Sequence, residues 1–358
     1  MPIPKKNQLV GVDIGSHSIK VAEIEESKHG MILKNFGMIG LPQEAIVEGS
    51  IKEMEIVSAA LRNLLKNLRI KNKNIATSVS GYSVIVKKIT IPRKEEVDLE
   101  KSIQNEAEQY IPFDINDVNL DFQILPSEIK DEKEEEKEEL MDVLLVAAKK
   151  DIVEEYISLF HLTELTPIVL DIDAFALQNA FEISNFEQSG CHAIVHIGAQ
   201  QLTINVVRDG VSIFTRDSSY GGSQITSEMQ KRLEVSYEEA EKIKLGAIPM
   251  ELDHRPIIED IFSSVITKWA QEIKRALDFV ATTFVDIKVD NILLSGGSSL
   301  IPGFSKYLGL ETGLPIEMLN PFSNLEVKEK IFDAAYLNYS APIAVISIGL
   351  ALRSIGDR

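Results

Sequence analysis

Cysteine and basic charge are both scarce in this chain, which has a single cysteine, Cys191, among its 358 residues. One cysteine cannot form an internal disulfide, and this favours a reducing compartment. The 37 Lys and Arg residues are outnumbered by 55 Asp and Glu residues, giving a formal net charge of −18. Nucleic-acid surfaces neutralise phosphates with clustered Lys and Arg, so this composition argues against a nucleic-acid partner.

Long apolar runs are also missing. The opening MPIPKKNQLVG lacks the apolar segment and cleavage site of an export signal. The most apolar stretch, APIAVISIGLALRS, is shorter than the about 20 residues that a bilayer requires. No Cys/His metal spacing, Ser-His-Asp arrangement or Walker A sequence is visible. We therefore expect a cytoplasmic protein without its own membrane anchor, able to dock on a membrane complex.

A hairpin with a polar, glycine-containing tip is predicted at the start of the chain. In VGVDIGSHSIKVAEI, residues 10–24, two alternating apolar runs flank Asp13, Gly15 and Ser16. Such a tip either simply turns the chain or presents backbone N–H groups to a phosphate, since successive N–H groups form an anion nest.

The same pattern returns in the second half. VDIGSHSIKVAEI at 12–24 aligns without a gap to VHIGAQQLTINVV at 195–207, an offset of 183 residues, and both copies continue into a third strand. Two facing hairpins could hold one polyphosphate between two lobes. A third glycine-rich turn, Gly296, Gly297 and Ser298, lies between a buried strand and a helix, where backbone can approach a ligand.

These motifs resemble the actin-like ATPase superfamily, which includes sugar kinases, heat-shock chaperone ATPases, MreB and FtsA. DIGSHSIK is similar to the phosphate-1 loop, HIGAQQLT to phosphate-2, LLSGGSSLIPG to the adenosine motif, and YEEAEKIKLG to a nucleoside-flanking segment of MreB. The resemblance implies ATP and Mg²⁺ as cofactors. It places nucleotide-binding roles on Asp13, Gly15, Ser16, His17, Ser18, Lys20, Gly198, Ala199, Gln200, Gln201, Thr203, Gly221, Gly222, Glu241, Lys244, Gly296, Gly297 and Ser298.

Within the superfamily, the sequence is most similar to the PilM family of type IV pilus assembly. EAEQYIPFDINDVNLDFQIL, MDVLLVAAKKDIVEEY, LDIDAFALQNAFE and FTRDSSYGGSQIT carry this likeness. It implies an ATP-binding scaffold with slow or no hydrolysis that receives the cytoplasmic N-terminal tail of PilN. It also implies contact with other platform proteins on the inner face of the inner membrane. Self-association is left open.

The expected fold is α/β and two-lobed: a duplicated ribonuclease-H-like unit with an inserted subdomain like that of FtsA. We expect the first lobe at 1–84 and 166–190, and the inserted subdomain, with part of the partner groove, at 85–165. The second lobe is expected at 191–345, including a small subdomain at about 226–285, and a C-terminal helix at 346–358 returns to the first lobe.

An acidic run at 131–139, with seven acids and two lysines, interrupts the inserted segment. It is interpreted either as a solvated loop extended by self-repulsion or as a contact for a basic partner.

One position departs from the superfamily pattern. Phosphate-2 normally begins with Asp, whereas this chain has His196, and a neutral imidazole does not supply the oxygen charge that Mg²⁺ favours. The resemblance implies that Asp13 remains as the carboxylate that holds Mg²⁺ through water. Asp173 is the candidate catalytic base, but Asp171 and Asp173 fit equally well as helix caps.

Other residues leave two readings open. Glu241 and Lys244 either flank the nucleoside or form a surface ion pair, and His17 either touches phosphate or is an exposed turn residue. Trp269 lies on a helical apolar stripe and is expected in the core. The alternative functions are a small-molecule kinase of the same superfamily and a filament-forming cytoskeletal ATPase.

Overall fold

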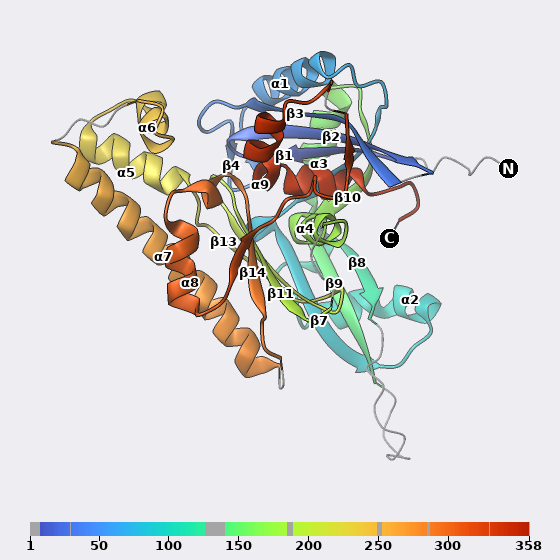
Figure 1. Ribbon diagram of the computed structural model, residues 1–358. Helices are drawn as coiled ribbons and strands as arrows, with labels where there is room; N and C mark the ends of the chain where they lie inside the picture. The colour runs from blue at the N-terminus through green and yellow to red at the C-terminus, as the bar shows by residue number, and fades with distance from the viewer. Residues whose placement is uncertain are drawn as a thin grey trace.

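The computed structural model describes residues 8–28, 30–125, 140–184, 189–248, 253–284, 287–328 and 330–357. The acidic run at 131–139 lies outside these residues, so neither interpretation of it is tested. Two large sheets form two lobes, and a small third sheet projects from the first of them (Figure 1).

A six-stranded sheet of order β10-β6-β1-β2-β3-β16 forms the first lobe. Its strands are β1 (Val10–Ile14), β2 (Ser18–Ser27), β3 (Gly30–Gly40), β6 (Asn74–Val79), β10 (Thr166–Ile172) and β16 (Glu326–Val327), with β4 (Ile46–Val47) and β5 (Ser50–Ile51) paired beside it. Every residue of β1 is buried, as expected for a central strand covered on both faces. Helices α1 (Met54–Asn67) and α3 (Lys150–Leu162) cover one face, where Leu61 and Phe160 share a core with Val12.

A five-stranded sheet of order β13-β12-β11-β14-β15 forms the second lobe. Its strands are β11 (Cys191–Ile197), β12 (Leu202–Arg208), β13 (Val211–Ser218), β14 (Asn291–Ser295) and β15 (Ile316–Met318). One face is covered by α5 (Ser223–Leu233), α7 (Arg255–Thr283) and α8 (Phe304–Thr312), and α6 (Tyr237–Lys244) packs on α5. Trp269 is fully buried in this core, which confirms its expected place.

The internal repeat is confirmed by strand order and register. In each lobe the first strand pairs antiparallel with the second and parallel with the fourth, as in β1 with β2 and β6, and β11 with β12 and β14. Asp13 lies opposite Lys20 in the first hairpin, and His196 lies opposite Thr203 in the second. The two hairpins are therefore equivalent elements of two copies of one unit.

Helices α4 (Asp173–Glu182) and α9 (Ala334–Ala351) lie between the two sheets (Figure 1). One core joins Ala76 of the first sheet, Phe181 of α4, Val345 of α9 and Ile194 of the second sheet. At Gly349 a Cβ atom would come within 1.8 Å of the backbone oxygen of Ala176, so the helices approach as closely as only glycine permits.

The position of α9 corrects the expected C-terminal helix at 346–358. The helix begins at Ala334, where the side chain of the N-cap residue Asp333 accepts a hydrogen bond from the Tyr336 N–H, and it ends at Ala351. Within the described part of the chain it is the one helix long and apolar enough to cross a membrane, but most of its residues are buried inside the protein.

The inserted subdomain is a three-stranded antiparallel sheet of order β7-β9-β8. It contains β7 (Val84–Pro92), α2 (Glu96–Ala107), the 3₁₀ turn η2 (Ile115–Asp117), β8 (Val118–Ile124) and β9 (Leu140–Lys149), which share a core of their own. Its expected end at residue 165 is wrong, since Tyr156, Leu159 and Phe160 of α3 pack in the first-lobe core. The residues of the separate core lie between Ile85 and Ala147.

Candidate functional site

A cavity of about 1560 Å³ opens between the two lobes. Its walls come from the β1–β2 hairpin, the β11–β12 hairpin, α6, the 3₁₀ turn η1 (Gly81–Ser83) that precedes the inserted subdomain, and the 3₁₀ turn η3 (Gly297–Leu300) after β14. The repeated motifs found in the sequence therefore meet in one place, although 183 residues separate the two copies.

The two hairpin tips have the same backbone turn. The Gly15 N–H donates to the Ser18 carbonyl at 3.2 Å, and the Gly198 N–H donates to the Gln201 carbonyl at 2.8 Å. Both turns line the cavity, and glycine at the first position lets the backbone approach a ligand closely. Paired turns of this kind can bind a polyphosphate through peptide N–H groups on its two sides.

An ion pair marks the first hairpin. Lys20 Nζ lies 3.2 Å from a carboxylate oxygen of Asp13, and both side chains are largely shielded, with 13% and 9% exposure. The pair crosses directly from β1 to β2, because Asp13 and Lys20 are register partners. The pair places an ammonium group and a carboxylate at the cavity floor. The ammonium of Lys20 can bind a phosphate, and the carboxylate of Asp13 can bind the metal ion that accompanies it.

His196 occupies the corresponding position in the second hairpin. One of its ring nitrogens, Nδ1, lies 3.0 Å from the Ser295 hydroxyl. Burial lowers the pKa of His196 to about 3, and the nearby Lys20 ammonium contributes to this shift. The imidazole is therefore neutral at physiological pH and provides neither a negative charge for a metal ion nor a positive charge for a phosphate.

Asp173 begins α4 and points toward the end of β6. Its two carboxylate oxygens accept hydrogen bonds from the Ser78 hydroxyl at 2.6 Å and the Ser80 hydroxyl at 2.7 Å. Burial raises the pKa of Asp173 to about 6, and the Asp13 carboxylate adds to this effect. A carboxyl group with a pKa near 6 is suited to exchanging protons with a bound water.

The helix-cap reading of Asp171 and Asp173 is wrong. The N-cap of α4 is Ile172, with no side-chain capping bond. Asp171 instead accepts from the Ile172 N–H and lies 3.5 Å from the Arg353 guanidinium, so it anchors the C-terminal segment to the first lobe. Burial raises the pKa of Asp171, while the Arg353 charge opposes the shift.

Glu241 and Lys244 form a shielded pair in the cavity wall. Lys244 Nζ lies 2.5 Å from Glu241 Oε1 and donates to the Thr226 hydroxyl oxygen at 2.9 Å, while that hydroxyl donates to Glu241. Both charged side chains are about one-eighth exposed, at 12% and 13%. Glu241 and Lys244 therefore form an ion pair, but a shielded one, and the i, i+3 spacing places both groups on the cavity side of α6.

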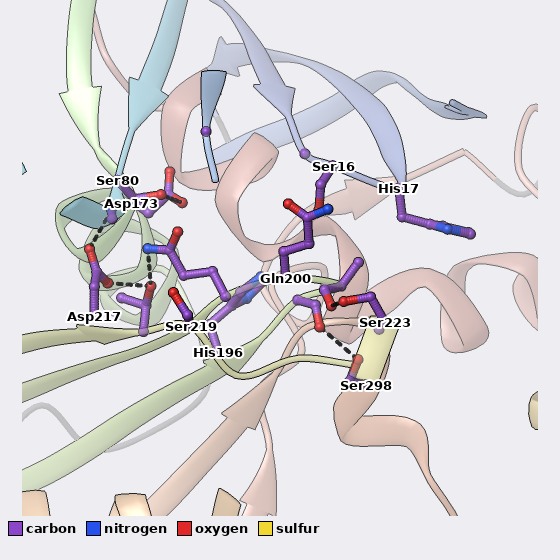
Figure 2. A pocket seen from close by; sticks show the side chains of 18 of the residues that line it. Ser16, His17, Ser80, Asp173, His196, Gln200, Asp217, Ser219, Ser223 and Ser298 are labelled. Atoms are coloured by element: carbon purple, nitrogen blue, oxygen red, sulfur yellow. Dashed lines mark hydrogen bonds between the residues drawn. The ribbon is translucent and has the colours of Figure 1, made fainter. Parts of the chain in front are cut away.

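Most of the predicted residues line the cavity, but Gly221, Gly222 and Gly296 do not. The Gly222 N–H donates to the Gly198 carbonyl, so these glycines pack behind the second hairpin. His17 is exposed at the cavity mouth, where Nδ1 lies 3.4 Å from the Tyr237 hydroxyl. Figure 2 shows Ser80, Asp173 and Asp217 on one side of the pocket and Ser223 and Ser298 on the other.

Asp217 is a cavity residue that the sequence did not single out. It lies on β13, opposite Thr203, and accepts a hydrogen bond from the Thr203 hydroxyl at 2.6 Å. Ser78, Ser80 and Gly81, at the end of β6, were also missed. The polar run SVSG at 78–81, and an acid in the third strand of the repeat, are the sequence signals that point to them.

The acidic groups fit a metal ion carried by a ligand better than a metal ion caged by the protein. In the described ranges no group of three or more His, Cys, Asp or Glu residues is arranged to hold a metal directly. Mg²⁺ usually keeps several waters and binds one or two carboxylates together with phosphate oxygens. Asp13 and Asp173 are shielded carboxylates at the cavity floor that fit this role.

The duplicated unit, the cleft between its copies and the inserted subdomain define the actin-like ATPase fold. One solved structure with this fold, a "PilM-PilN type IV pilus biogenesis complex", has a TM-score of 0.85 and 24% identity, and covers 98% of this chain and 100% of that one. EutJ of Carboxydothermus hydrogenoformans has a TM-score of 0.56 at 16% identity over 98% and 90% of the two chains. MreB 5 of Spiroplasma citri bound to AMPPNP has a TM-score of 0.53 at 11% identity, and the match covers 97% of this chain and 95% of that one.

A family model supplies the particular identification. The model for type IV pilus assembly protein PilM matches residues 11–355, nearly the whole chain. The chain belongs to the PilM family of type IV pilus assembly proteins.

The elevated pKa of Asp173 predicts a measurable pH dependence of stability. The folded protein holds this proton more tightly than the unfolded chain, whose ordinary value is 3.8. As pH rises from 4 to 7, the carboxyl therefore lowers the free energy of unfolding, by up to about 3 kcal/mol. Asp173→Asn removes this loss, so the variant gains stability relative to the wild type between pH 4.5 and pH 7.5, measured by urea denaturation.

The matched control is Asp278→Asn, which changes the same group on the exposed side of α7. It should show nearly the same difference from the wild type at both pH values. The assignment is contradicted if Asp173→Asn shows a pH-independent difference.

Proposed function

We propose that this chain is an ATP-binding scaffold of the type IV pilus inner-membrane complex. The observation that carries the proposal is the convergence of two equivalent hairpin turns, at 15–18 and 198–201, on one cavity in a PilM-family fold. Family membership favours this function over the two alternatives, a small-molecule kinase and a filament-forming ATPase.

The proposed nucleotide site divides into a phosphate end and a nucleoside end. The hairpin turns, Lys20 and Asp13 bind the phosphates and the Mg²⁺ that accompanies them. Glu241 and Lys244 face the nucleoside, and Gly297 and Ser298 of η3 complete the wall beside it. When bound, Mg²⁺ supplies positive charge that neutralises phosphate oxygens near the carboxylates.

Hydrolysis by this site is proposed to be slow. The second hairpin places a neutral imidazole, His196, where the superfamily has a carboxylate, so charge on the metal side is reduced. Asp173 is the candidate general base, and its hydrogen bonds from Ser78 and Ser80 fix the carboxyl group in place. ATP then acts mainly as a ligand that joins the lobes.

The proposed partner is the cytoplasmic N-terminal tail of PilN, which holds the protein at the inner face of the inner membrane. The cavity supports a groove for such a peptide because it continues past η1 to Val84, Val86 and Phe113 of the inserted subdomain. Lys149 Nζ lies 4.5 Å from the Phe113 ring centroid, so this part combines apolar surface with a positive charge.

Asp13→Ala tests the phosphate end. Removing a carboxylate that faces hydrated Mg²⁺ should weaken Mg-ATP binding about tenfold or more, measured by isothermal titration calorimetry. With EDTA in place of Mg²⁺ the loss should vanish or reverse, because the carboxylate then only repels the phosphates. Asp278→Ala, on the exposed side of α7, is the control and should bind like the wild type.

Two results contradict the nucleotide assignment. One is the absence of ATP binding by the wild type with Mg²⁺ present. The other is brisk phosphate release by the wild type, because it would show that the site does not need a carboxylate at position 196.

Phe113→Ala tests the peptide groove. A peptide with the first residues of a cognate PilN should bind the wild type with a micromolar-range constant, roughly −8 kcal/mol. Loss of an aromatic anchor should weaken binding about tenfold, measured by fluorescence anisotropy. Phe279→Ala, on the half-exposed surface of α7, is the control. Equal affinity of all three proteins, or peptide cross-links only outside 84–149, would place the groove elsewhere.

A further inference from the structure

Asp217 links the phosphate hairpin of the second lobe to the first lobe. One carboxylate oxygen, Oδ1, accepts from the Thr203 hydroxyl at 2.6 Å within the second lobe. The other, Oδ2, accepts from the backbone N–H of Gly81 at 2.8 Å in the first lobe. These are the two dashed lines that leave Asp217 in Figure 2.

The register of the second sheet explains this position. His196, Thr203 and Asp217 face one another across three adjacent strands, β11, β12 and β13. Thr203 therefore lies between Asp217 and His196, and His196 is at the position where the superfamily has a carboxylate. The second lobe does bring a carboxylate to the phosphate end of the cavity, two strands from the expected position.

The Gly81 end of the contact lies at a junction in the chain. Strand β6 ends at Val79, η1 spans Gly81–Ser83, and β7 of the inserted subdomain begins at Val84. Gly81 has a φ of +81°, and a Cβ there would lie 3.0 Å from the side-chain oxygen of Gln201, in the second hairpin turn. The start of the inserted subdomain is thus packed directly on the hairpin proposed to bind phosphate.

A second contact crosses the cleft beside the first. The Glu48 N–H donates to the side-chain oxygen of Gln200 at 3.0 Å, also in the hairpin turn. The Asp217 contact differs in strength, because a hydrogen bond to an ionised carboxylate is roughly twice as strong as one between neutral groups. If the lobes separate, the Gly81 N–H also loses Asp217 as its hydrogen-bond acceptor.

We propose that Asp217 is a positioning residue that couples the nucleotide site to the inserted subdomain. This inference rests on the proposed function, namely ATP in the cleft and a peptide against 84–149. A nucleotide that fixes the 198–201 turn stabilises the Asp217–Gly81 bond and so fixes the start of β7. By linkage, ATP strengthens peptide binding and the peptide strengthens ATP binding by the same factor, about five- to tenfold.

The direct test of the contact is hydrogen exchange of the full chain, read by mass spectrometry on a peptide that begins at residue 78 or earlier and covers 80–86. Asp217→Ala should speed exchange of the Gly81 amide about tenfold or more, because its acceptor is gone. Asp217→Asn should keep most of the protection, since its amide oxygen can accept from Gly81 while its NH₂ group donates to the Thr203 hydroxyl oxygen. Asp278→Asn should match the wild type.

The location of the faster exchange distinguishes the proposed coupling from a role of Asp217 in overall stability alone. General destabilisation speeds exchange throughout β11 and β14, whereas loss of the contact changes 80–86 and leaves those strands protected. Unchanged exchange at Gly81 in Asp217→Ala, or equal acceleration throughout the second-lobe sheet, overturns the inference.

The coupling is tested by titrating the PilN-type peptide with and without saturating Mg-ATP. The wild type should show the five- to tenfold gain, and in Asp217→Ala the factor should fall to about one. An undiminished factor in Asp217→Ala overturns the inference while the proposed function stands. If the wild type binds no ATP in calorimetry, the inference and the proposed function both fail. The calorimetric measurement therefore distinguishes failure of the proposed function from failure of the inference alone.

Discussion

The close packing of α4 and α9 between the two sheets is the constraint on which the cleft depends. Both helices contribute to a core that contains residues of each lobe, so the lobes are held through a shared interior. Gly349 lets α9 approach the backbone of α4, where any Cβ would collide with Ala176. This approach brings the hairpin turns at 15–18 and 198–201 to the same cavity.

The η3 turn depends on the same helix. The Gly296 N–H donates to the Pro342 carbonyl of α9 at 2.7 Å, and Gly296 has a φ of +87° that glycine tolerates. The wall beside the proposed nucleoside position is therefore fixed to the element that joins the lobes. A ligand held by η3 and by both hairpins would add to the forces that keep the lobes in one arrangement.

Electrostatics gives the cleft a second constraint. Asp13, Asp173 and Asp217 lie near one another at its floor, so burial raises the pKa of Asp173 and the other two carboxylates add to this effect. Lys20 partly compensates, but His196 is neutral and adds no charge. A polyphosphate entering this site needs an accompanying cation, which is why we expect binding to depend on Mg²⁺. The slow turnover that we propose would follow from one position, His196.

The hairpins could be predicted from the sequence because their apolar alternation and glycines are local and occur twice. The Glu241–Lys244 pair was predictable from its i, i+3 spacing, but its burial against Thr226 was not. Asp217 escaped prediction because its role comes from strand register and from Gly81, 136 residues away in the chain. The ends of the inserted subdomain and of α9 were misplaced because tertiary packing assigns α3 to the first-lobe core and Asp333 starts the helix early.

A crystal structure of the chain with Mg²⁺ and a non-hydrolysable ATP analogue tests the central claim most directly. The account predicts phosphates between the turns at 15–18 and 198–201, with the ribose beside Glu241 and Lys244. A nucleotide bound to one lobe only, or outside the cleft, would contradict it.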